Sequence, residues 1–162
     1  RLHGMFPLVS PGCPRCTEEA ATFLHMVWEC PSLRQRWEQV MEVIQEVIGV
    51  GLQFTPQVCL LGLMKRTKTT KQYLRFADLA MVLFKRQIAR VRKAPQPPVL
   101  QDWLREVYKW TKVEADVLTL LAKQRGGDTL VTVWDTYVLR MAEKVNPAPL
   151  NTAIVAVNAM AQ

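Results

Sequence analysis

Three cysteines and one histidine lie close together near the start of this 162-residue chain, with the spacing C-x2-C-x8-H-x4-C. Thiolate and imidazole are the ligands that zinc prefers in structural sites, and four protein ligands leave no open position for water. The motif therefore predicts one structural Zn²⁺ ion that holds the fold together without taking part in a reaction. Its ligands would be Cys13, Cys16, His25 and Cys30.

The residues around the cysteines suit such a site, which we place at residues 11–31. Pro14 lies inside the C-x2-C segment and favours a tight turn, which would direct both sulfurs to the same side. We expect a helix from Thr17, with Thr17 as its N-cap, to carry His25 back to the metal. Pro31 follows the last cysteine directly, where it would begin the next helix at its first position.

Two other interpretations of the motif stay open at this point: a chance cluster, or cysteines that belong to a disulfide framework. The chain has four cysteines, no apolar signal segment and no Asn-x-Ser/Thr acceptor, so nothing marks it as secreted. Cys59 lies in an apolar run and is expected to be a small buried hydrophobic residue. We therefore expect an intracellular protein.

Apolar residues recur at helical spacing through most of the remaining chain, and strand-type alternation is absent over any useful length. This pattern predicts an all-α fold, a helical bundle with an N-terminal Cys3His zinc knuckle, as a single domain over residues 1–145. Periodicity alone does not decide between a short helix and an extended segment for residues 52–64. The small-residue tail 146–162 is expected to be poorly ordered. The predicted helices span about residues 31–48, 70–93, 98–123 and 128–145.

Composition argues against a disordered chain and against a membrane-spanning protein. About half of the residues are hydrophobic, which is enough for one core, but no apolar run approaches the ~20 residues needed to cross a bilayer. Arg1 in place of Met leads us to expect a piece of a longer protein. The five tryptophans would either stack on bases or, as their helical spacing favours, pack in the core.

Positive charge is concentrated in the middle of the chain. Residues 65–93 contain ten basic side chains and one acidic side chain, a net +9, whereas the segments on either side are slightly acidic or neutral. Such a stretch is a candidate surface for RNA or DNA, because each phosphate that it neutralises releases counterions. The alternative is a solvated helix face without a partner. The residues predicted to contact phosphates are Lys71, Arg75, Lys85, Arg86, Arg90, Arg92 and Lys93.

The ordered set of these features resembles the zinc-binding region that follows the polymerase in LINE-type non-LTR retrotransposon reverse transcriptases of vertebrates. The resemblance covers roughly residues 11–145 and is carried by the cysteine-histidine motif and four later blocks. It departs from the family where Val91-Arg92-Lys93 stands in place of a Trp that the family often carries, and in the tail. The blocks are the helix with Leu33-Arg34-Gln35-Arg36-Trp37, then Leu60-Leu61-Gly62-Leu63, then Lys85-Arg86-Gln87-Ile88-Ala89-Arg90, then Pro97-Pro98 with Trp103-Leu104.

The resemblance implies an accessory region that holds template RNA or target DNA, in an active element or a captured host copy. It also implies a location in a nuclear and cytoplasmic ribonucleoprotein. No polymerase, endonuclease or nucleotide-binding motif is present, so we expect no enzymatic activity and no small-molecule substrate. A second hypothesis is a zinc-stabilised protein-interaction module, which binds another protein or a second copy through the apolar tail. A continuous basic face over residues 71–93 would favour nucleic acid, and an exposed apolar groove beside Ile154 and Val157 would favour a protein.

Overall fold

The computed structural model describes residues 11–65, 71–125 and 129–146. Within them the regular structure is entirely helical and contains no strand, which confirms the predicted all-α class. The helices, in chain order, are η1 (His25–Glu29, a short π-helix), α2 (Pro31–Ile48), α3 (Pro56–Leu61), α4 (Lys71–Arg90), α5 (Leu100–Arg125) and α6 (Thr129–Val145).

The chain forms two compact units, residues 1–107 and residues 108–162, and the boundary falls inside α5. The prediction that residues 1–145 fold as one domain stays a prediction. The first unit contains the cysteine-histidine motif and most of the predicted basic surface, so it concerns function most directly. In the second unit Trp134 and Tyr137 of α6 are buried, with their ring centroids 5.7 Å apart.

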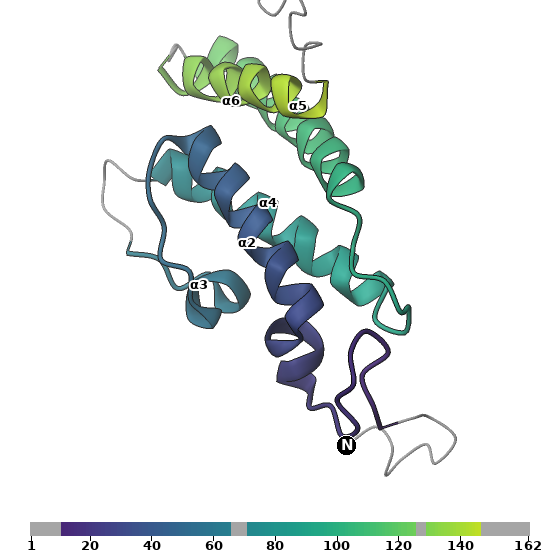
Figure 1. The fold of residues 1–162 in the computed structure, drawn as a ribbon. Coiled ribbons are helices and arrows are strands. Elements are labelled where there is room, and N and C mark those ends of the chain that lie inside the picture. The colour runs from purple at the N-terminus through teal and green to yellow at the C-terminus, as the bar shows by residue number, and fades with distance from the viewer. Residues whose placement is uncertain (1–10, 66–70, 126–128, 147–162) are drawn as a thin grey trace, which may run out of the picture. The chain divides into compact units, whose positions relative to one another are not determined.

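The core of the first unit lies between α2 and α4, which pack side by side (Figure 1). Trp37 of α2 meets Phe84 of α4 edge to face with ring centroids 4.6 Å apart, and both side chains are fully buried. Trp103, at the start of α5, extends this aromatic row and donates a hydrogen bond from Nε1 to the carbonyl of Ala80 (3.0 Å). Trp28 is buried as well, so these three tryptophans belong to the core, as their spacing favoured.

Helix α2 has the bounds that the sequence predicts. Pro31 occupies the first turn, where its missing N–H costs nothing, and Gly49 ends the helix in the left-handed conformation with φ 72°. The apolar stripe between them faces the core along its whole length. Its buried members are Leu33, Trp37, Val40, Met41, Ile44, Val47 and Ile48.

The segment that periodicity left undecided contains a single short helix, α3. The side chain of Thr55 accepts a hydrogen bond from the Val58 amide and so caps the first turn, and Gly62 ends the helix with φ 68°. Helix α3 packs against α4, and Lys85 of α4 donates from Nζ to the carbonyl of Leu60 (2.9 Å).

The later helices agree with the predicted ranges except near their ends. Helix α4 ends at Arg90 and is followed by a turn, whereas the prediction extended it to residue 93. The predicted tail lies outside the described residues except for Asn146. Among the described helices, none has an apolar stretch of the length that a membrane span requires.

Candidate metal centre

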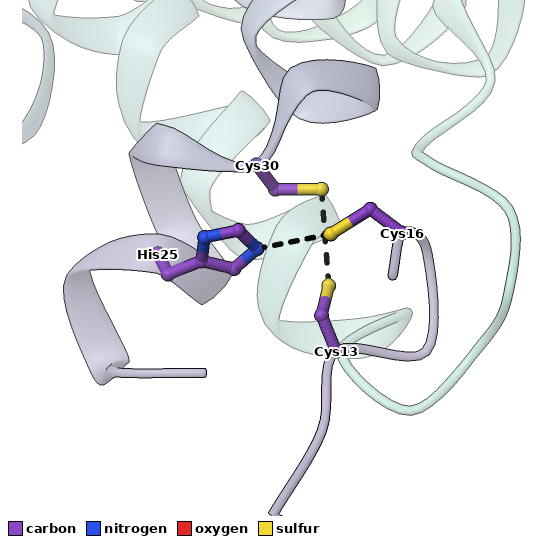
Figure 2. A group of neighbouring side chains, drawn as sticks. All are labelled: Cys13, Cys16, His25 and Cys30. Atoms are coloured by element: carbon purple, nitrogen blue, oxygen red, sulfur yellow. Dashed lines mark hydrogen bonds between the residues drawn. The ribbon is translucent and has the colours of Figure 1, made fainter. Parts of the chain in front are cut away.

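The four predicted metal ligands come together in the first unit. One ligand atom from each of Cys13, Cys16, His25 and Cys30 lies within 4.8 Å of all the others. Figure 2 shows the three sulfurs and the imidazole pointing toward one another. All four cysteines of the chain are free thiols, so the disulfide interpretation is wrong for this arrangement.

The spacing of these atoms fits one tetrahedral ion. Two sulfurs bound to a tetrahedral zinc at about 2.3 Å would lie about 3.8 Å apart. The sulfurs of Cys13 and Cys30 are 3.8 Å apart, and the sulfur of Cys16 lies 3.3 Å from Nε2 of His25. The chemistry of the donors agrees with the geometry, because three thiolates and one imidazole form a preferred structural set for zinc.

Backbone hydrogen bonds fold the first two cysteines into a closed turn. The Cys13 amide donates to the carbonyl of Glu18 (2.8 Å), and the Ala21 amide donates to the carbonyl of Pro11 (2.9 Å). These bonds occupy the backbone that a helix beginning at Thr17 would need, so that prediction is wrong. The helical turns begin only after Thr22, whose hydroxyl accepts from the His25 amide (3.0 Å).

The remaining two ligands are held by η1 and its junction with α2. His25 opens η1, and the Cys30 amide donates to the His25 carbonyl (3.0 Å), which ties these two ligands together. The indole Nε1 of Trp37 donates to the carbonyl of Val27 (3.0 Å) and fixes η1 against α2. The candidate metal centre is therefore built onto the aromatic core of the first unit.

The thiols differ in how readily they lose a proton. Burial by itself raises the pKa of Cys13, but hydrogen bonds from the Arg15 backbone and from the side chains of His25 and Cys16 outweigh it and lower that pKa from 9.0 to about 7. Burial raises the pKa of Cys30, and the nearby Cys13 raises it further. A second negative charge is thus disfavoured unless a cation balances it, which is what a divalent metal would do.

Arg15 is a functional residue that sequence reasoning missed. It stands between two of the ligands and is buried, and its guanidinium donates to the carbonyls of Met26 (3.0 Å) and Val91 (3.1 Å). One side chain thus joins the cysteine turn, η1 and the turn that follows α4. An arginine in a C-x2-C turn carries no sequence signal that separates this role from ordinary exposure to solvent.

Cys59 lies outside the cluster, as predicted. Its side chain is fully buried, and burial raises the pKa of its thiol to about 11. It behaves as a small apolar residue on the buried face of α3 and offers a control thiol for tests of the four candidate ligands.

The predicted basic surface is interrupted in the middle of α4. Lys85 is half-buried against the Leu60 carbonyl, and burial lowers its pKa. Arg86 forms an ion pair with Glu106, whose carboxylate also accepts from Gln87. These two basic residues therefore have partners within the fold.

The other predicted basic residues fall into two places. Arg75 is exposed near the start of α4, and the side chain of Lys71 lies outside the described part of the chain. Arg90, Arg92 and Lys93 are all exposed, and we call this group the basic end of α4. Arg75 and Arg90 are roughly 22 Å apart along the helix, given a rise of ~1.5 Å per residue. The exposed basic residues of the described part of α4 and its following turn thus lie in two places, and their contact with phosphates stays a prediction.

In comparisons with known proteins, no family model matches the chain and no solved structure matches it significantly. The resemblance to LINE-type reverse transcriptases, which rests on residue blocks, stays a prediction from the sequence.

Proposed function

We propose that Cys13, Cys16, His25 and Cys30 bind one structural Zn²⁺ ion. The observation that carries this proposal is the 3.8 Å separation of the Cys13 and Cys30 sulfurs, which matches two corners of a zinc tetrahedron. The ion would balance the negative charge that builds up when neighbouring thiols ionise, and it would hold the cysteine turn against η1. With four protein ligands it has no open position for substrate, so its role is structural.

Metal analysis tests this proposal directly. The purified protein should contain one zinc per chain, and Cys16→Ser should lose the metal and the rigidity of the cysteine turn. Cys59→Ser is the matched control, because that thiol is buried away from the cluster, and this variant should keep its zinc. Retention of zinc by Cys16→Ser, or its loss in Cys59→Ser alone, would contradict the ligand set.

We further propose that the first unit is a non-catalytic nucleic-acid-binding module that contacts phosphates with the basic end of α4. The observation that carries this proposal is the exposure of Arg90, Arg92 and Lys93 directly after the helix. Arg90 forms a loose ion pair with Glu106, with 3.7 Å between Nη1 and Oε1, and 61% of its side chain stays exposed. The resemblance to the accessory region of a reverse transcriptase supports the same function.

The candidate metal centre and this basic end belong to one structural assembly. Arg15 leaves the cysteine turn and donates to the carbonyl of Val91, the residue directly before Arg92. Zinc would thus fix the turn that presents Arg92 and Lys93 to a ligand. We expect RNA or DNA to be bound with weak sequence preference, because phosphate contacts position a nucleic acid without reading its bases.

Charge reversal tests this function. Arg92→Glu combined with Lys93→Glu should weaken binding to a fluorescent RNA or DNA oligonucleotide by at least about tenfold at low salt. The matched control is Lys109→Glu combined with Lys123→Glu, which changes the charge equally at two exposed residues of α5 within the second unit. Arg86 is left unchanged, because a glutamate there would face Glu106. Equal binding by the double variant and the wild type would rule out the basic end of α4 as the contact surface.

A second candidate function, self-association, is favoured by a stripe of exposed apolar side chains on α5. Trp110, Val113, Val117 and Leu120 are between 40% and 61% exposed and alternate at spacings of three and four, which is the pattern of a coiled-coil seam. The occupant that this spacing fits is the same helix of a second copy. A mass measured across a concentration series should then approach that of a dimer and return to that of a monomer in Val117→Glu. A monomer at every concentration would exclude this function.

A further inference from the structure

A hollow lies in the first unit where α4 ends and the chain turns toward α5. Its volume is about 290 Å³, and Val91, Ala94, Pro97 and Val99 give it an apolar lining. Arg90 and Gln87 add polar groups at its wall. The volume is close to the lower end of the ~300–1,000 Å³ typical of ligand pockets, so the hollow has room for one small group.

The walls of the hollow are held in place by the fold. The Ala94 amide donates to the Val91 carbonyl (2.9 Å), and the Trp103 amide donates to the Val99 carbonyl (3.3 Å), which fixes both ends of the connection. Pro97 and Pro98 restrict its backbone further, and Pro98 is buried. Because the hollow is already formed, the protein loses little conformational entropy when a ligand enters it.

The polar groups at the wall are also fixed. Gln87 is 8% exposed, and its Nε2 donates to Glu106, which in turn pairs with Arg86. Arg90 is different, because 61% of its side chain is exposed and it stands beside Arg92 and Lys93. Asp102 also lines the hollow, but its carboxylate is paired with Arg105 at 3.1 Å. The hollow therefore combines an apolar interior, a buried amide and the cationic side chain of Arg90 at its wall, with the exposed Arg92 and Lys93 close by in the chain.

A ligand that matches these features has a flat apolar face and an attached anionic group. We propose that the hollow takes one unstacked base of a single-stranded nucleic acid, while Arg90, Arg92 and Lys93 contact the neighbouring phosphates. In a duplex the faces of the bases are covered by stacking, so only a single strand offers a base to the hollow. This inference rests on the proposed nucleic-acid binding and names the class of ligand: single-stranded over double-stranded.

The experiment compares two single strands with the same backbone. A twelve-residue oligothymidylate and an abasic strand of equal length are titrated with the zinc-loaded protein, together with a twelve-base-pair duplex. The wild type should bind the oligothymidylate about tenfold more tightly than the abasic strand, because base stacking adds to the phosphate contacts. Equal affinity for both strands would overturn the proposal, and this comparison needs no variant.

A matched pair of variants locates the effect. Ala94→Leu places extra carbons in the hollow and should remove the preference for the strand with bases, whereas Ala89→Leu, on an exposed part of α4 outside the hollow, should keep it. A preference that survives in Ala94→Leu, with that variant folded, would overturn the hollow as the site. If both strands bind equally and charge reversal at Arg92 and Lys93 weakens both, only the hollow fails. If none of the three ligands binds at low salt, both the hollow as a base site and the proposed nucleic-acid binding fail.

Discussion

Cys13 and Cys30 differ in how readily their thiols ionise. Hydrogen bonds favour the thiolate of Cys13, whereas burial and the neighbouring Cys13 disfavour the thiolate of Cys30. The first proton is therefore lost easily and the second only when positive charge is supplied. Binding of the proposed zinc to these two sulfurs, 3.8 Å apart, would release their protons and would therefore depend on pH.

Zinc affinity should fall as the pH is lowered from 8 to 6. Cys13 has a pKa of about 7, depressed from 9.0, so its thiolate is present above pH 7 and is lost as the pH falls through that value. Cys30 has a raised pKa and must release a proton to zinc throughout this range. The apparent affinity should drop by about tenfold per pH unit for each proton released. Competition with a chromophoric chelator measures it, and an affinity independent of pH would contradict this titration.

Arg15 should contribute more to stability than an arginine with a local partner. Arg15→Ala removes two charge-assisted hydrogen bonds that join separate segments and should lower the free energy of unfolding by about 2–4 kcal/mol. Arg36→Ala is the control, because Arg36 donates to Gln39 on the same helix, and its loss should cost less than about 1 kcal/mol. Urea unfolding of the zinc-loaded protein measures both. Equal losses in the two variants would contradict the linking role of Arg15.

At the scale of elements, the first and last residues of a helix were predicted well where the sequence carries capping or helix-breaking residues that the fold uses. Helix α2 carries its own signals, Pro31 at its start and Gly49 at its end, so its bounds follow from the sequence. Thr17 offers an equally good local signal, yet the cysteine turn uses the backbone of residues 18–21 for its own hydrogen bonds. The helix that carries His25 therefore begins later than propensity predicts.

Gly62 ends helix α3, and a single added methyl group tests whether this position requires glycine. Its φ of 68° is left-handed, and a Cβ there would lie 3.2 Å from a carboxylate oxygen of Asp78. Gly62→Ala should therefore lower the free energy of unfolding by about 1–2 kcal/mol. Gly51→Ala is the control, because its Cβ would meet only Gln45 at an ordinary 3.8 Å. Thermal melts of the two variants that coincide would show that the end of α3 tolerates a side chain.

At the scale of the whole molecule, the sequence predicted the fold class and the cluster of three cysteines and one histidine, but not the partners of the basic residues. The cluster follows from residue types at a fixed spacing within one short segment, so its formation depends little on distant parts of the chain. The surroundings of Arg86 and Lys85 do not follow from spacing, because Glu106 from a distant segment pairs with Arg86, and Lys85 donates to a backbone carbonyl. Such pairings depend on tertiary packing, which local spacing does not encode. The same limit hid Arg15, whose two acceptors lie 11 and 76 residues away.

The proposed zinc site and the proposed nucleic-acid surface lie at the same end of the first unit. There Arg15 of the cysteine turn donates a hydrogen bond to the carbonyl of Val91, within the basic end of α4. Only a few phosphate contacts are available there. Nucleic-acid binding should accordingly be moderate in strength and clearly dependent on salt.

The most direct measurement is a salt titration of binding by the zinc-loaded protein to single-stranded RNA, single-stranded DNA and duplex DNA. Three phosphate contacts by Arg90, Arg92 and Lys93 predict that log affinity for a single strand falls with log salt at a slope of about −2. The two single strands should bind more tightly than the duplex. Absence of binding at low salt, or an affinity that does not change with salt, would contradict nucleic-acid binding by this surface.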